Sequence, residues 1–62
     1  MMNRLLTVEE VATLLRLSPR GVYNLVAARR IPHIKVGTRV RFKVEQVEEW
    51  LAEKTVDEVK PT

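Results

Sequence analysis

The sequence predicts a small α+β domain with the element order helix, helix, β-hairpin, helix. Apolar residues recur at helical spacing in three segments, and a segment that alternates apolar and charged residues separates the second from the third. A chain of 62 residues has room for one thin core. We therefore expect one domain over residues 1–52 and a charged tail over residues 53–62 that frays or extends the last helix by a turn.

A capping box marks the start of the first helix. The Thr7 hydroxyl can accept a hydrogen bond from an early helical amide, while Glu10, three residues later, can accept one from the backbone of Thr7. The helix is expected to run to about Arg16. Its apolar stripe follows the i, i+3, i+4, i+7 pattern and consists of Val8, Val11, Ala12 and Leu15.

A second helix follows after a very short connection. Ser18 is a favourable N-cap, and Pro19 fits the first helical turn because its missing amide hydrogen would have no partner there. We expect this helix to end at about Ala28 or Arg29. Helices joined so tightly cross steeply, as in a helix-turn-helix. The inward residues are Val22, Leu25 and Val26.

The segment from His33 to Phe42 alternates with a period of two, which predicts a β-hairpin. Keeping its apolar residues on one face requires a three-residue loop over residues 37–39, with Val36 opposite Val40 and Ile34 opposite Phe42. Lys35, Arg39 and Arg41 would then share the outer face. A two-residue Gly37-Thr38 turn, which would pair Val36 with Arg39, is the alternative that we do not favour.

The third helix is expected over residues 44–52. Its apolar stripe includes Val47 and Trp50, while Glu45, Glu48 and Glu49 face solvent. Because Trp50 and Phe42 both lie on apolar stripes, we assign them to the core rather than to base stacking.

Charge is distributed unevenly along the chain. The segment from Arg16 to Lys43 contains eight basic residues and no acidic one, whereas the rest of the chain has a net charge of −5, so that the whole carries +3. Such a segment repels itself unless an external polyanion supplies the opposite charge. A solvated basic face is the simpler interpretation, but the segregation favours nucleic acid as a partner.

The composition argues against an enzyme. There is no cysteine, the single histidine has no potential metal-binding neighbour in sequence, and the only two glycines form no phosphate-binding loop. We therefore expect no catalytic residues, no metal, no cofactor and no small-molecule substrate. No stretch is apolar enough for a signal peptide or a membrane span, so we expect a cytoplasmic protein with no membrane partner.

Several short motifs together carry a family resemblance. In order they are Leu5-Leu6-Thr7-Val8-Glu9-Glu10-Val11-Ala12, Leu14-Leu15, Leu17-Ser18, Val22-Tyr23, Ile31-Pro32, Val36-Gly37, Arg41-Phe42 and Val47-Glu48-Glu49-Trp50-Leu51. Their order and spacing resemble the excisionase-type helix-turn-helix family, small relatives of the MerR-type winged helix. The resemblance implies a winged helix-turn-helix that binds double-stranded DNA, associated with the nucleoid of a bacterium or with a phage or mobile element.

Two positions depart from the family pattern. Arg16 stands where a glycine is frequent at the turn between the first two helices, and a left-handed backbone at an arginine costs roughly 1 kcal/mol. The sequence leaves open whether the turn keeps that geometry. Gly21 stands where a better helix former is usual, which either sequence drift or a close approach of the backbone to phosphate could explain.

Candidate DNA contacts come from the second helix and the hairpin. An α-helix fits the major groove, where an arginine can bind guanine and an asparagine adenine, and hairpin cations can bind phosphate. Arginines close to the helix ends are expected as secondary phosphate contacts. The expected DNA-binding residues are Ser18, Arg20, Tyr23, Asn24, Lys35, Thr38, Arg39 and Arg41, and the secondary contacts are Arg16, Arg29 and Arg30.

The resemblance implies an excisionase-like architectural factor for recombination, with an integrase-type recombinase or further copies of this chain on adjacent sites as partners. A small transcriptional regulator of the same fold is the alternative, although the long dimerisation helix of MerR-type regulators is not found. A protein-interaction module with a basic docking face is a third hypothesis.

Overall fold

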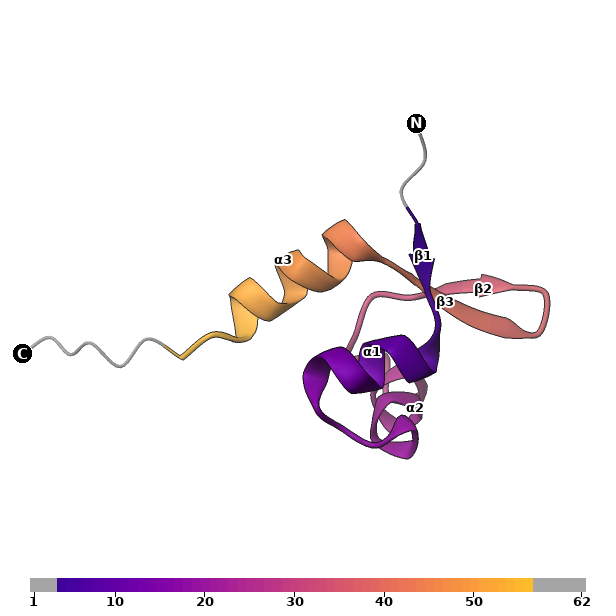
Figure 1. The fold of residues 1–62 in the computed structure, drawn as a ribbon, viewed down its shortest axis with the longest axis horizontal. Helices are drawn as coiled ribbons and strands as arrows, with labels where there is room; N and C mark the ends of the chain where they lie inside the picture. The colour runs from indigo at the N-terminus through magenta and orange to yellow at the C-terminus, as the bar shows by residue number, and fades with distance from the viewer. Residues whose placement is uncertain (1–3, 57–62) are drawn as a thin grey trace, which may run out of the picture.

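The computed structural model describes residues 4–56, so the predicted tail from residue 57 onward lies outside the described part of the chain. Figure 1 shows the arrangement of its helices and strands. The observed elements are β1 (Leu5–Leu6), α1 (Val8–Leu15), α2 (Pro19–Ala27), β2 (Ile34–Val36), β3 (Arg39–Lys43) and α3 (Val44–Lys54). The predicted order is confirmed, with β1 as an added strand and with α3 continuing two residues beyond the predicted end.

The capping box of α1 is present as predicted. The Glu10 amide donates to Oγ1 of Thr7 at 3.1 Å, and the Thr7 amide donates to Oε1 of Glu10 at 2.9 Å. Arg4 forms an ion pair with the other carboxylate oxygen of Glu10. The hydrogen bond from the Thr7 amide, followed by the nearby charge of Arg4, lowers the pKa of Glu10 below its usual value.

Replacing Glu10 with glutamine is expected to make the stability of the fold decrease less as pH falls. A carboxyl group with a lowered pKa in the folded state stabilises the fold above its unfolded pKa, and this stabilisation disappears as pH falls. Glutamine keeps a hydrogen-bond acceptor in the capping box but has no charge. Thermal melting should therefore show wild type more stable than Glu10→Gln near pH 7, with the difference shrinking below about pH 4. An equal difference at both pH values would contradict this role of the Glu10 charge.

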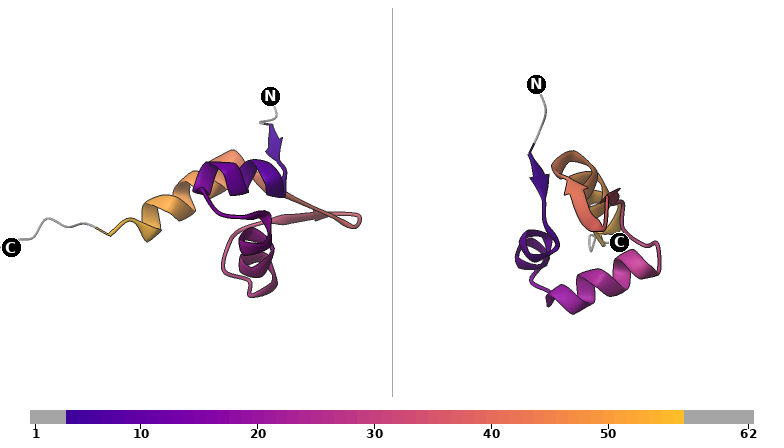
Figure 2. Two further views of the ribbon diagram at one scale, coloured as in Figure 1. Left: turned by 60° about the horizontal axis from the view of Figure 1, so that its bottom comes forward. Right: turned by 90° about the vertical axis from the view of Figure 1, so that its right-hand side faces the viewer.

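α2 begins at the predicted N-cap. Oγ of Ser18 accepts a hydrogen bond from the Gly21 amide at 3.1 Å, and Pro19 occupies the first helical position. In the right-hand view of Figure 2, α1 is seen nearly end-on while α2 lies across the view, so the two helices cross steeply. The connection between them therefore has the geometry of a helix-turn-helix.

Both helices end at an arginine in the left-handed conformation. Arg16 follows α1 with φ of 59°, and Arg29 follows the end of α2 with φ of 57°. The next amides bond back into each helix, from Leu17 to the Ala12 carbonyl and from Arg30 to the Leu25 carbonyl, each at 2.9 Å. These are Schellman motifs, in which glycine is the preferred left-handed residue. The turn at Arg16 is therefore left-handed, at a cost of about 1 kcal/mol.

A three-stranded antiparallel sheet has the order β1-β3-β2. β1 is not predicted from the sequence, because two leucines are too few to show the alternation of apolar and polar residues that marks a strand. In the sheet, Leu6 pairs with Phe42 and Leu5 with Lys43. Because paired residues share a face, Leu6 lies beside fully buried Phe42 and helps to cover the core.

The predicted hairpin register is wrong. β2 and β3 join through a two-residue Gly37-Thr38 turn, which pairs Val36 with Arg39 and Lys35 with Val40. Gly37 has φ of +63°, and a two-residue turn with glycine first and only that residue at positive φ fits the type II′ hairpin. The hairpin tip projects away from the helices (Figure 1), where the core cannot hold Val36, whose exposed fraction is 53%. Turn geometry therefore decides the register.

The core lies where the helices meet the sheet. Its buried residues are Val8, Val11, Ala12, Val22, Ile31, Phe42 and Val47. Phe42 is a core residue as predicted, whereas Trp50 packs against the core but remains partly exposed. Its indole Nε1 donates to the Arg30 carbonyl at 2.7 Å and so connects α3 to the segment that follows α2. The fold is a winged helix-turn-helix, made of the crossing helices α1 and α2, the β2–β3 hairpin and α3.

Candidate nucleic-acid interface

A groove of about 620 Å³ separates α2 from the hairpin. We call it the α2–hairpin groove. Positively charged side chains enter it from both walls, Arg29 from the end of α2 and Lys35 from β2, and no acidic residue lines it. The complete lining is Tyr23, Asn24, Val26, Ala27, Arg29, His33, Lys35, Thr38 and Val40. A groove with cations on opposite walls suits an anion better than an apolar ligand.

A smaller groove of about 280 Å³ adjoins the first one and lies between the start of α1 and the hairpin. We call it the α1–hairpin groove. Tyr23, Thr38 and Val40 border both grooves. Its other lining residues are Thr7, Val8, Glu9, Arg39 and Arg41. The two grooves therefore form one hollowed surface between the helices and the hairpin.

The exposed face of α2 carries the predicted reading residues. Arg20, Tyr23 and Asn24 are exposed and, at i, i+3 and i+4, lie on one side of the helix. Tyr23 and Asn24 also line the α2–hairpin groove, whereas Arg20 lies outside both grooves in the first turn of α2. Ser18 is exposed beside them, and although its Oγ accepts the capping hydrogen bond, its hydroxyl hydrogen can still be donated.

The hairpin cations do not share one face, contrary to the prediction. Since Lys35 pairs with Val40 while Arg39 pairs with Val36, Lys35 lies on the opposite face of the hairpin from Arg39 and Arg41. This follows from the two-residue turn, because a shift of one residue moves side chains to the other face. Lys35 lines the α2–hairpin groove, and the two arginines line the α1–hairpin groove, where Nη1 of Arg41 donates to the Val40 carbonyl at 2.8 Å.

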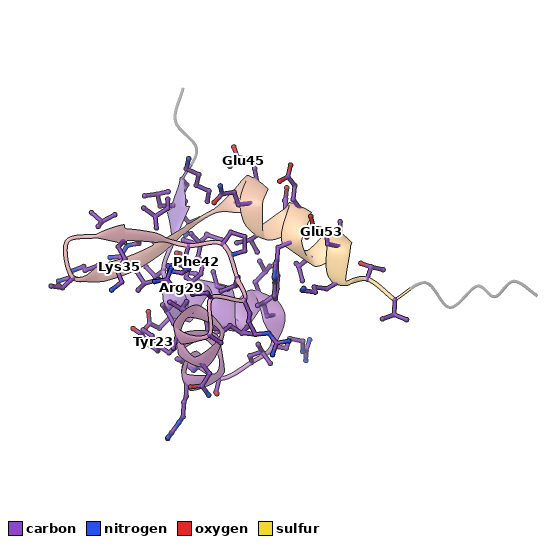
Figure 3. The ribbon with its side chains drawn as sticks, turned by 180° about the vertical axis from the view of Figure 1, so that it is seen from behind. Tyr23, Arg29, Lys35, Phe42, Glu45 and Glu53 are labelled. Atoms are coloured by element: carbon purple, nitrogen blue, oxygen red, sulfur yellow. The ribbon has the colours of Figure 1, made fainter. Side chains whose placement is uncertain are left out.

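Within residues 4–56, the cations of the acid-free segment form no salt bridge. Over residues 4–56 the structure contains one salt bridge, between Arg4 and Glu10, and neither residue belongs to that segment. Figure 3 shows Tyr23, Arg29 and Lys35 on one side of the molecule, whereas Glu45 and Glu53 project from α3 on the other. The acidic side chains of α3 therefore lie away from Arg29 and Lys35, whereas Glu9 of α1 lines the α1–hairpin groove with Arg39 and Arg41.

Of the secondary contacts expected from the sequence, Arg29 lines the α2–hairpin groove. Arg16 and Arg30 are exposed but lie outside both grooves. His33 also lines the α2–hairpin groove, although no role is expected for it from the sequence. Its Nδ1 lies 2.9 Å from the Ile31 carbonyl oxygen. The signal for His33 was available, because its spacing of two from Lys35 places both on the same side of an extended strand.

Gly21 does not mark a tight contact within the protein. A Cβ at this position would meet Oγ of Ser18 at 3.6 Å and Cβ of Leu17 at 3.7 Å, both ordinary packing distances. An alanine therefore fits the free protein.

The described part of the chain contains neither a candidate metal site nor a candidate membrane-spanning helix. Residues 4–56 contain no group of three or more histidine, cysteine, aspartate or glutamate side chains placed to hold a metal ion. None of the helices described here is both long enough and apolar enough to cross a membrane.

Comparison with known proteins agrees with the geometry. A family model described as a helix-turn-helix domain matches residues 5–55 of the 62-residue chain. Searches of curated proteins and of solved structures find no match. In a helix-turn-helix the second helix lies in the major groove of DNA, so the match supports DNA as the partner. Because the matched residues make up most of its length, the chain belongs to the helix-turn-helix domain family.

Proposed function

We propose that this protein binds double-stranded DNA with sequence selectivity and that α2 is the reading helix. The single observation that carries the proposal is the hollowed, acid-poor surface between α2 and the hairpin. The acid-free segment contributes cations to this surface, and among residues 4–56 none of them forms a salt bridge. On α2, Arg20 binds guanine or phosphate and Asn24 binds adenine. Tyr23 and Ser18 donate their hydroxyl hydrogens to phosphate.

The hairpin holds the DNA rather than reading it. Arg39 and Arg41 on one face, Lys35 on the other and Thr38 in the turn bind phosphate oxygens. A DNA backbone that crosses the hairpin can contact both faces, so the separation of the cations does not remove them from the interface. Outside the grooves, Arg16 and Arg30 contribute through their charge at longer range.

For the biological role we propose an excisionase-like architectural factor of a phage or mobile element. The sequence resemblance supports this role, and a single reading helix covers few base pairs, so that firm binding requires several copies on adjacent sites or an integrase-type recombinase beside them. A transcriptional regulator of the same fold would act as a preformed dimer. Sedimentation should therefore show a monomer in the absence of DNA, and a stable dimer would favour the regulator.

Selection from a library of random duplexes tests the proposed function. We expect the protein to enrich one short motif, and to bind a duplex containing that motif in preference to random duplex and to heparin at equal charge concentration. A basic module that docks an acidic protein would bind heparin as well as any duplex and would enrich no motif. That outcome would exclude sequence-selective DNA binding.

A further inference from the structure

The second left-handed arginine of the fold has no structural role that requires its side chain. At Arg29 the Schellman hydrogen bonds use backbone atoms alone, from the Arg29 amide to the Val26 carbonyl at 3.0 Å and from the Arg30 amide to the Leu25 carbonyl at 2.9 Å. Glycine would make the same bonds without the steric cost of a Cβ at φ of 57°. Residues in strained backbone conformations cluster at functional sites, so the surroundings of Arg29 need to be considered.

The position of Arg29 indicates what its side chain does. It lines the α2–hairpin groove, and in the described residues its guanidinium takes part in no salt bridge or side-chain hydrogen bond. Lys35 lines the same groove from the hairpin, and Asn24 and Thr38 add further donors. Figure 3 shows Arg29 and Lys35 on the same side of the molecule. Within the described residues, the groove therefore carries two cations that form no salt bridge and two neutral side chains that can donate hydrogen bonds, and no acidic residue lines it.

We propose that the α2–hairpin groove binds the phosphodiester backbone of one DNA strand and that Arg29 is its principal anchor. This inference rests on the proposed DNA binding. It identifies where the DNA strand next to α2 is bound. When α2 lies in the major groove, the strand between α2 and the hairpin must pass through this groove. The guanidinium of Arg29 binds two oxygens of one phosphate, and Lys35 adds a charge from the opposite wall. The left-handed backbone after α2 places this side chain at the groove.

Two matched substitutions separate this role from a general effect of charge. Arg29→Gly and Arg16→Gly each remove one positive charge and one left-handed arginine, but only Arg29 lines the groove. Because both relieve backbone strain, we expect each variant to melt about 4–8 °C above wild type. On a random-sequence duplex, Arg29→Gly should bind about tenfold or more weakly, and its salt slope should fall by about 1. Arg16→Gly loses only a longer-range charge and should weaken binding less, by no more than about threefold.

A second pair tests the opposite wall of the groove. Lys35→Ala should weaken binding to the same duplex, whereas Lys43→Ala, an exposed lysine of the same hairpin outside both grooves, should have a smaller effect. Arg29→Lys keeps the charge and should recover part of the affinity lost in Arg29→Gly.

The outcomes distinguish this inference from the proposed function. If wild type binds the duplex but Arg29→Gly retains wild-type affinity and salt slope, or if both glycine variants lose affinity equally, the groove is not the strand site. A lower melting temperature for Arg29→Gly would show that the arginine side chain stabilises the fold and would overturn the argument from strain. Failure of wild type to bind any duplex would instead contradict the proposed function.

Discussion

Replacing Phe42 with alanine is expected to remove most of the protein's free energy of unfolding. Phe42 is fully buried on the central strand, beside Leu6 of β1 and in one core with residues of all three helices. Truncating a buried phenylalanine costs about 3–5 kcal/mol. A domain this small has a free energy of unfolding near the low end of the usual range, about 5 kcal/mol. Urea denaturation followed by circular dichroism measures the loss.

Val36 provides the matched control on the same hairpin. Because its exposed fraction is 53%, Val36→Ala should change the free energy of unfolding by less than about 0.5 kcal/mol. A loss at Val36 comparable to that at Phe42 would indicate that Val36 packs with Val40 and Phe42, as the three-residue loop requires. The pair of variants therefore tests the observed hairpin register as well as the position of the core.

Replacing Arg20 with alanine is expected to cost about 1–3 kcal/mol of binding free energy on the preferred sequence and to relax the preference at one base position. Arg20 is exposed in the first turn of α2, so the substitution should leave the free energy of unfolding nearly unchanged. Binding to a set of duplexes that differ at single positions measures both the loss of affinity and the loss of selectivity.

Arg39→Ala is the informative comparison for Arg20. Arg39 stands at the turn of the hairpin and lines the α1–hairpin groove, where we propose that it binds phosphate. Its removal should weaken binding to all sequences by about the same factor. If Arg39→Ala changed the preference at one base position while Arg20→Ala weakened all duplexes alike, the assignment of α2 as reader and of the hairpin as holder would be reversed.

The helices could be predicted from the sequence because their signals are local. The Thr7 and Glu10 capping box, the Ser18 cap and Pro19 all act within one turn, and the structure places each helix start where they indicate. The hairpin register could not be obtained in this way. Keeping the apolar residues on one face favours a three-residue loop, whereas Gly37 favours a two-residue turn. The turn decides the register because the hairpin tip lies beyond the core, where there is little burial to gain.

The candidate site was only partly accessible to sequence reasoning. Tyr23 and Asn24 lie three and four residues after Arg20, which predicts one shared side of the helix, and the structure shows both lining a groove. The grooves themselves depend on how the hairpin packs beside α2, which is a long-range feature. The left-handed conformation of Arg29 has no sequence signal either, because an arginine at that position predicts an ordinary helix end.

The salt dependence of duplex binding tests the central claim most directly. If the cations of the acid-free segment face the DNA and neutralise about five or six phosphates, the logarithm of the binding constant should fall with the logarithm of salt concentration at a slope of about −5. Titrations of one duplex over a range of salt concentrations give this slope. A slope near zero would show that these cations do not face DNA and would contradict the account.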